Sequence, residues 1–267
     1  MSIPLHSIPS TRLPALFIGH GSPMNTLEDN PYTQAWRALG AALPRPQAIL
    51  AISAHWLTRG IAVTAMERPR TIHDFGGFPQ ALHEVQYPAP GSTALAQRVA
   101  ALLAPRPVAL DSDEWGLDHG TWSVLAHLYP MADIPVVQLS MDATQGEAFH
   151  LEIGQALRSL RDEGVLIVAS GNIVHNLRLM KWSQTGFGHD WAVRFDAFAK
   201  RKIEARDFSA LAHYQSEGHD AKLAVPTAEH FWPLLYALGA AGDDDAISFP
   251  VEGLTMGGIS MRSVQIG

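Results

Sequence analysis

The sequence contains no cysteine, which excludes disulfides, thiolate metal sites and a cysteine nucleophile. Positive charge is also scarce, because 19 lysine and arginine residues stand against 26 aspartate and glutamate residues, giving a net charge of −7. No basic cluster occurs along the chain. Binding to nucleic acid or to an anionic membrane surface depends on such a cluster, so neither partner is expected. A chain without cysteine fits a reducing compartment such as the cytoplasm.

Long hydrophobic runs are absent as well. No apolar run approaches the roughly 18 residues that suggest a membrane span. Residues 1–10 lack the charged and apolar regions of a signal peptide. We therefore expect a cytoplasmic protein that does not cross a membrane. The sequence leaves its oligomeric state open.

The chain does have enough hydrophobic residues, 47%, for a sizeable buried core. Short apolar runs alternate with amphipathic stretches, and this order predicts an α/β fold. We expect a single-domain three-layer sandwich, with a central mixed sheet and helices on both faces, after a lead-in over residues 1–13. Strands are predicted at residues 15–18, 48–53, 61–65, 108–110, 135–139, 165–169, 247–249 and 259–266. Helices are predicted at residues 92–103, 147–163 and 190–206, and those near residues 190–240 could form a cap.

Histidine is abundant, with thirteen residues, and three of them follow strongly apolar runs. These are His20, His55 and His175. Open α/β sheets place ligands at the carboxyl ends of their strands, so we expect the three imidazoles to lie at one edge of the sheet. Histidine is the commonest metal ligand. Taken singly, each could equally be a hydrogen-bonded histidine of the core.

A fourth histidine, His230, is predicted to open a helix next to Glu229. Adjacent helical positions diverge by about 100°, so only one of these two side chains is expected to face the site. We predict that His230 joins the other three around one metal ion. Imidazole ligands suit zinc, copper, iron or nickel, so the ligand type alone leaves the metal open.

Five short blocks of sequence together carry a resemblance to a known family. They are Gly-His-Gly-Ser-Pro-Met at residues 19–24, Ser-Ala-His-Trp at 53–56, Ile-His-Asp-Phe-Gly-Gly-Phe-Pro at 72–79, Trp-Gly-Leu-Asp-His-Gly at 115–120 and Ala-Ser-Gly-Asn-Ile-Val-His-Asn at 169–176. In this order they resemble the class III extradiol ring-cleavage dioxygenases, above all the bacterial and plant 4,5-DOPA dioxygenase extradiol group. The resemblance implies a catalytic domain over residues 14–267.

The resemblance also implies a non-haem Fe(II) site with His20, His55 and His230 as ligands. His175 matches the histidine assigned as catalytic base, which can also contact the metal. His119 matches a histidine near the substrate that could act as an acid. Many extradiol enzymes have a carboxylate at the third ligand position, whereas this chain has histidine. Because neutral nitrogen ligands also suit Zn(II), zinc could occupy the same site.

Further polar residues surround these blocks. Residues 67–91 form a long loop rich in proline, glycine and aromatics, and we predict that it is a pocket wall or lid. His73 and Asp74 in this loop and Ser22 after the first histidine are candidates for substrate contact, with ordinary loop and turn roles as the alternatives. Asp118 could orient His119 or cap the helix that follows.

The reaction that the resemblance implies is insertion of O2 into the ring of a catechol such as L-DOPA. Cleavage at the 4,5 bond would give a seco-DOPA semialdehyde, with the catechol and O2 as partners. Two other functions suit the same histidines. One is a zinc-dependent hydrolase that activates water, and the other is a non-catalytic protein whose metal ties the sheet edge together.

Overall fold

A mixed sheet of eight strands organises the fold of residues 12–267, which the computed structural model describes. Residues 1–11 of the predicted lead-in lie outside this range. Four parallel strands occupy the middle of the sheet: β5 (Val136–Asp142), β2 (Ala48–Thr58), β6 (Val165–Gly171) and β1 (Ala15–Gly19). Beyond β5 lie β3 (Ile61–Thr64) and β4 (Val108–Asp111), and beyond β1 lie β10 (Ser263–Ile266) and β7 (Ile247–Val251). The sheet is mixed because β3 runs antiparallel to β5, and β10 antiparallel to β1.

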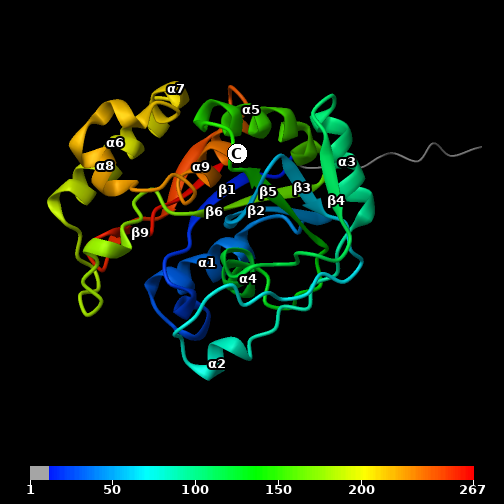
Figure 1. The fold of residues 1–267 in the computed structure, drawn as a ribbon, viewed down its shortest axis with the longest axis horizontal. Helices are drawn as coiled ribbons and strands as arrows, with labels where there is room; N and C mark the ends of the chain where they lie inside the picture. The colour runs from blue at the N-terminus through cyan, green and yellow to red at the C-terminus, as the bar shows by residue number, and fades with distance from the viewer. Residues whose placement is uncertain (1–11) are drawn as a thin grey trace, which may run out of the picture.

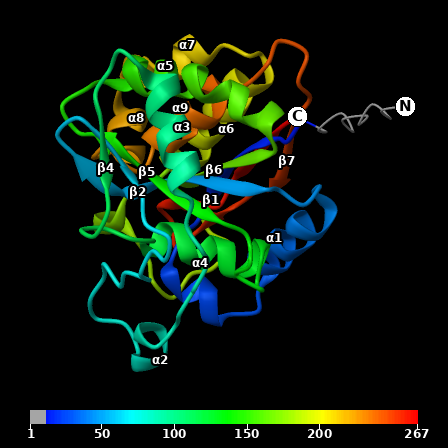
Figure 2. The same ribbon diagram turned by 90° about the vertical axis from the view of Figure 1, so that its right-hand side faces the viewer.

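Helices cover both faces of this sheet (Figures 1 and 2). One face carries α3 (Thr93–Leu103), α5 (Glu147–Leu157), α9 (Trp232–Gly239) and the group α6 (Asp190–Glu204), α7 (Phe208–Leu211) and α8 (His219–Ala224). The other face carries α1 (Pro31–Ala42), α4 (His119–Leu128) and the short α2 (Gln80–His83). The predicted three-layer α/β sandwich is confirmed.

The central strands are buried on both faces, which explains their continuous apolar runs. Along β1, Ala15 and Phe17 pack into the core on the α5 and α9 side, while Leu16 and Ile18 pack into the core on the α1 and α4 side. This split follows from the alternation of side chains along a strand. The α6–α8 group shares the first of these cores, so it extends the domain and is not a separate cap.

Three predicted elements differ from the structure. The strand expected at residues 48–53 continues to Thr58, with a shift in its pairing to β5 between Ile52 and Leu57. The helix expected at residues 147–163 changes to a 3-10 helix over Arg158–Glu163, which ends at Gly164 with φ +76°. The strand expected at residues 259–266 is two strands, because β9 (Ile259–Ser260) pairs instead with β8 (Leu254–Thr255).

Within residues 12–267, no helix combines the length and the apolar character that crossing a bilayer requires.

Candidate metal centre

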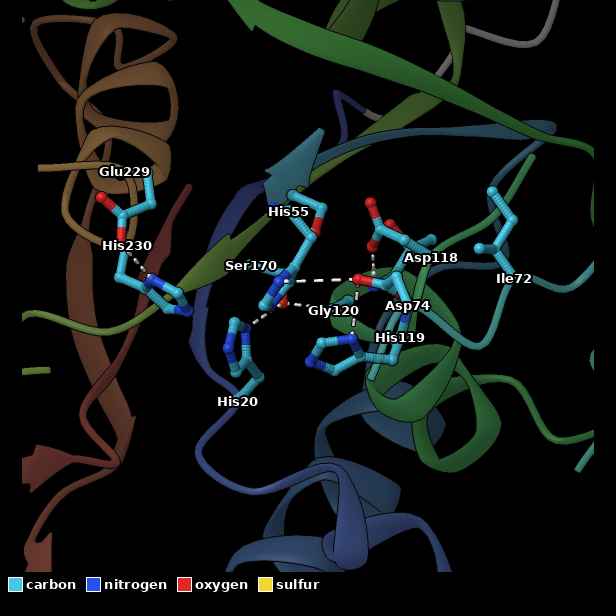
Figure 3. Close-up of polar contacts among 12 residues, drawn as sticks. His20, His55, Ile72, Asp74, Asp118, His119, Gly120, Ser170, Glu229 and His230 are labelled. Atoms are coloured by element: carbon cyan, nitrogen blue, oxygen red, sulfur yellow. Dashed lines mark hydrogen bonds and ion pairs between the residues drawn. The ribbon is translucent and has the colours of Figure 1, made fainter. Parts of the chain in front are cut away.

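Three of the predicted histidines meet beside the carboxyl end of the central strands. His20 directly follows β1, His55 lies within β2, and His230 precedes α9. Each offers a ring nitrogen, and these nitrogens lie within 4.8 Å of one another. Figure 3 shows the three side chains converging from these separate segments. The prediction for His55 was wrong in one detail, because β2 runs on through this residue.

Two further histidine rings border this trio. The ring of His175 stacks on that of His230, with centroids 3.5 Å apart and planes 6° from parallel. On the opposite side the ring of His119 lies 3.8 Å from that of His55, centroid to centroid. The structure therefore brings together all five histidines that the sequence analysis selected for the metal and for catalysis.

Two glycines allow the segments that carry these histidines to approach so closely. A Cβ added to Gly19, the last residue of β1, would lie 2.7 Å from the backbone carbon of Met261. A Cβ added to Gly171, its partner at the end of β6, would lie 2.3 Å from the carbonyl oxygen of His230. Since either contact would force the backbone apart, any larger residue here would displace His20 or His230.

A hydrogen-bond chain sets the tautomer of His20. Ser170 donates its hydroxyl proton to the carbonyl oxygen of Gly120 at 2.5 Å, and its Oγ lies 2.9 Å from Nδ1 of His20. Because the serine proton is already committed, Nδ1 of His20 must be the donor to Oγ. The neutral ring then carries its lone pair on Nε2, which can bind a metal. Figure 3 shows this chain.

Nδ1 of His230 is engaged in the same way, by Oε1 of Glu229 at 3.1 Å. Of these two residues only His230 lines the cavity beside the site, while Glu229 contacts the far side of its ring, but the reason is not the one expected. They precede α9 in a turn instead of sitting inside a helix, so the 100° divergence of helical neighbours does not apply. Glu229, His175 and His230 together form a second group with ligand atoms within 4.8 Å of one another.

Asp74 of the predicted lid holds His119 through two contacts. The backbone N–H of His119 donates to Oδ1 of Asp74 at 2.8 Å, and its Nδ1 lies 2.9 Å from Oδ2. The same Oδ2 lies 3.6 Å from Nδ1 of His55. Asp118 instead caps α4, since Oδ1 accepts from the backbone N–H of Thr121 at 3.1 Å. Asp74 is therefore the carboxylate that orients His119.

The electrostatics of the cluster favour neutral rings. Burial is the largest cause of the lowered pKa of His55, about 3, and of His175, about 4. Burial, reinforced by the neighbouring histidines, also holds the pKa of His20 and of His230 well below the ordinary value. Neutral imidazole is the form that binds metals.

Burial alone would raise the pKa of Asp74, but the hydrogen bonds from His119 outweigh it and hold that pKa below its ordinary value. The site therefore pairs an ionised carboxylate with unprotonated histidines.

A metal ion fits these residues. Among the described residues, the buried Nε2 of His55 finds no hydrogen-bond partner, a costly state for a polar atom unless a ligand satisfies it. His20 and His230 both use Nδ1 for a hydrogen bond, which leaves Nε2 available. Ring nitrogens fixed by partners on their other side are typical of metal-binding histidines. His20, His55 and His230 could therefore hold one divalent transition metal ion.

A cavity of about 250 Å³ opens beside this trio. All five histidines line it, and so does Ser22, whose Oγ also accepts from the backbone N–H of Met24 at 3.2 Å. The structure does not bring His73 to this cavity. Nε2 of that residue lies 2.9 Å from the carbonyl oxygen of Val85, and its ring packs near Trp122. The lid instead contributes Phe75 and Phe78.

Two functional residues escaped the sequence analysis. Ser170 was only the end of a strand, although its position between the apolar run at residues 165–169 and Gly171 could have indicated a place at the site. Asp74 was considered only as a substrate contact. Its partner is 45 residues away in the sequence, so nothing local could have indicated the pairing.

The fold and the histidine-lined cavity are those of an aromatic ring-opening dioxygenase. Residues 14–266 match the family described as "Catalytic LigB subunit of aromatic ring-opening dioxygenase", and the chain belongs to this family. The predicted enzyme class, a ring-cleavage dioxygenase, is thereby confirmed.

Individual relatives agree with this assignment. The chain is 56% identical to "4,5-DOPA dioxygenase extradiol" of Escherichia coli K12 over 97% of this chain and 96% of that protein. It is 40% identical to "4,5-DOPA dioxygenase extradiol" of Beta vulgaris over 85% of this chain and 87% of that protein. The crystal structure of an uncharacterized Escherichia coli K12 protein, 50% identical, superposes with a TM-score of 0.85 over 96% of this chain and 100% of that one.

Proposed function

We propose that this chain is a metal-dependent extradiol dioxygenase that cleaves a catechol, with residues 14–267 as its catalytic domain. L-DOPA is the first substrate to test, and cleavage at the 4,5 bond would give a seco-DOPA semialdehyde. The observation that carries the proposal is the trio of neutral imidazoles of His20, His55 and His230 at the wall of the cavity. The cysteine-free sequence favours the reducing cytoplasm as its compartment.

His20, His55 and His230 would hold the metal, and Fe(II) is the ion that we propose for catalysis. When bound, Fe(II) would bring the two catechol oxygens and O2 to one centre and pass electrons between them. Zn(II) could bind the same neutral ligands and would not exchange electrons. Zinc also binds such ligands more tightly than Fe(II), so occupation by zinc after purification is expected unless iron is supplied.

His175 is the residue that we assign as general base. Its ring lines the cavity and stacks on His230, so a catechol hydroxyl bound near the metal would lie within its reach. Burial lowers the pKa of His175 to about 4, so the ring is unprotonated at neutral pH and ready to accept the phenolic proton. Because this pKa is low, the protonated ring of His175 readily gives the proton up again to the ring-opened product.

His119 is suited to hold a proton on the other side of the cavity. Asp74 accepts from Nδ1, so Nε2 of the neutral ring carries the lone pair. If that ring takes up the proton of the second catechol hydroxyl, the carboxylate of Asp74 stabilises the resulting charge. We therefore assign His119 as the acid that donates to the oxygen of the opening ring, with Asp74 as its positioning residue. Ser22, on the cavity wall, is proposed to contact the substrate.

The two alternative functions make different demands on this cavity. A structural metal needs a closed ligand shell, whereas here about 250 Å³ lies beside the proposed ligands. The all-imidazole ligand set would suit a zinc hydrolase equally well. The chain's membership of a dioxygenase family argues against that function. The proposed substrates are thus a catechol and O2.

Oxygen uptake separates these functions. The purified protein is stripped of metal, loaded with Fe(II) under nitrogen, and given L-DOPA or unsubstituted catechol in an oxygen electrode, beside a zinc-loaded sample. We expect oxygen uptake and a yellow ring-opened product with iron alone. Ester hydrolysis by the zinc sample, without oxygen uptake by the iron sample, would favour the hydrolase. No uptake with any catechol would refute the proposal.

A further inference from the structure

The cavity has two chemically different parts. Histidines form the part nearest the proposed metal ligands. The rest of the wall is apolar and is formed mainly by Phe75, Phe78, Leu177, Met180, Trp182 and Met256. Among the described residues, no lysine, arginine, aspartate or glutamate lines this cavity. A catechol whose hydroxyls face the histidines would therefore direct its ring substituent towards apolar side chains.

Backbone hydrogen bonds hold this apolar wall in place. The N–H of Lys181 donates to the carbonyl oxygen of Met256 at 2.8 Å. The N–H of Met256 donates in turn to the carbonyl oxygen of Gln184 at 2.9 Å. Further along, the N–H of Gly257 donates to the carbonyl oxygen of Phe187 at 2.8 Å. Because the segment that carries Met180 and Trp182 is paired in this way, the wall exists before substrate binds. A preformed site need not spend binding energy on ordering.

Three charged residues near the cavity, Asp74, Glu229 and Lys181, have their charged groups on other partners. Asp74 accepts from His119, and Glu229 accepts from the ring of His230. Nζ of Lys181 lies over the ring of Phe187, 4.9 Å from its centroid. An ammonium or carboxylate group on a bound catechol would therefore lose water without gaining a charged partner, which is unfavourable.

The rim of the wall also exposes apolar surface. The side chains of Leu177 and Trp182 line the cavity, yet they remain 54% and 66% exposed. Large apolar residues grouped at the mouth of a cavity mark a surface that gains by being covered. An apolar substituent on the substrate would cover it.

We propose, building on the dioxygenase function above, that the preferred substrate is a catechol with an uncharged, apolar substituent on the ring. The charged side chain of an amino acid such as L-DOPA is tolerated only where it reaches solvent. Leu177, Met180 and Trp182 are the specificity-determining residues, since they form the wall that the substituent contacts.

A series of four catechols that differ chiefly in charge tests this preference. They are 4-propylcatechol, which is uncharged; dopamine, with an ammonium group; 3-(3,4-dihydroxyphenyl)propionate, with a carboxylate; and L-DOPA, with both. For the iron-loaded enzyme we expect kcat/KM for 4-propylcatechol to exceed that for L-DOPA by about tenfold or more, a factor equal to about 1.4 kcal/mol. Equal values, or a preference for L-DOPA, would overturn the proposal.

Matched variants locate the preference in the wall. Leu177→Ala and Trp182→Ala should each lower kcat/KM for 4-propylcatechol by roughly three- to tenfold and change that for L-DOPA much less. Leu110→Ala is the control, because Leu110 is similarly exposed, at 47%, but lies on the edge strand β4 away from this cavity. It should match the wild type on both substrates. Equal losses on both substrates in the wall variants would count against specificity.

Binding measurements keep this inference separate from the proposed reaction. Dissociation constants for the four catechols are measured by calorimetry under nitrogen with the metal-loaded protein. Tighter binding of 4-propylcatechol than of L-DOPA supports the apolar wall even if no catechol is cleaved, in which case only the dioxygenase proposal falls. Cleavage of all four with L-DOPA bound most tightly would overturn the substrate preference and leave the reaction standing.

Discussion

Replacing Ser170 with alanine should weaken metal binding through His20, without touching the metal. The substitution removes the Ser170 hydroxyl, which accepts the Nδ1 proton of His20 and donates to the carbonyl oxygen of Gly120. Ser170 is only 1% exposed, so water cannot replace the hydroxyl. Leaving those two buried groups unpaired costs about 1–3 kcal/mol each, so we expect the free energy of unfolding to fall by about 2–6 kcal/mol. Loss of a partner behind a metal-binding histidine typically lowers metal affinity by about 10–100-fold.

The assay compares two properties of the same variants. Metal affinity is measured by competition with a chelator, and stability by urea unfolding of the metal-free protein. Ser140→Ala is the control, because Ser140 is also buried and its Oγ hydrogen-bonds to the N–H of Ala62 and the hydroxyl of Thr58, both at 2.7 Å, and not to a histidine. It should lose stability and keep its metal affinity. If Ser170→Ala binds metal as tightly as the wild type, or if both variants lose metal equally, the tautomer reasoning is wrong.

Other perturbations test other parts of the site. His175→Ala should abolish turnover and retain most of the metal, whereas His20→Ala should lose both; equal metal loss, measured by elemental analysis, would contradict a separate base role. Asp74→Ala frees the ring of His119 and should lower kcat by roughly 10–100-fold in steady-state assays, and an unchanged kcat would exclude a positioning role. Burial lowers the pKa of His150 to about 4, so the unfolded chain binds more protons below about pH 6.5. The metal-free protein should therefore lose stability as the pH falls from about 6.5 towards 4, and His150→Leu should show a shallower loss in urea titrations at pH 7 and pH 5.

The parts of the fold and site that sequence could predict were those with local signals. The apolar runs before His20 and His175 end in glycine-containing turns, and parallel strands bring their carboxyl ends together. Those two facts placed both histidines at the same edge of the sheet. The alternation of strands and helices was enough to predict the layers, because central strands such as β1 and β6 are buried on both faces.

The parts that could not be predicted depend on tertiary contacts. β2 extends through His55 because β5 offers it a partner as far as Thr58, and nothing in the sequence of β2 requires that length. His230 was assigned to a helix, yet the backbone there must meet Gly171, so α9 begins only at Trp232. Pairings between a loop and a distant helix, such as the one that fixes His119, have no periodicity to detect.

The three proposed ligands come from segments far apart in the chain, and this separation ties metal binding to folding. His20, His55 and His230 meet only after the sheet has formed and the turn before α9 has packed against it. An unfolded chain has no such site, so bound metal stabilises the native state alone, by about 2.7 kcal/mol at a free concentration a hundred times the dissociation constant. The unfolding midpoint of a protein that binds metal at these three residues would therefore report metal occupancy, and a chelator that removes the metal would lower that midpoint.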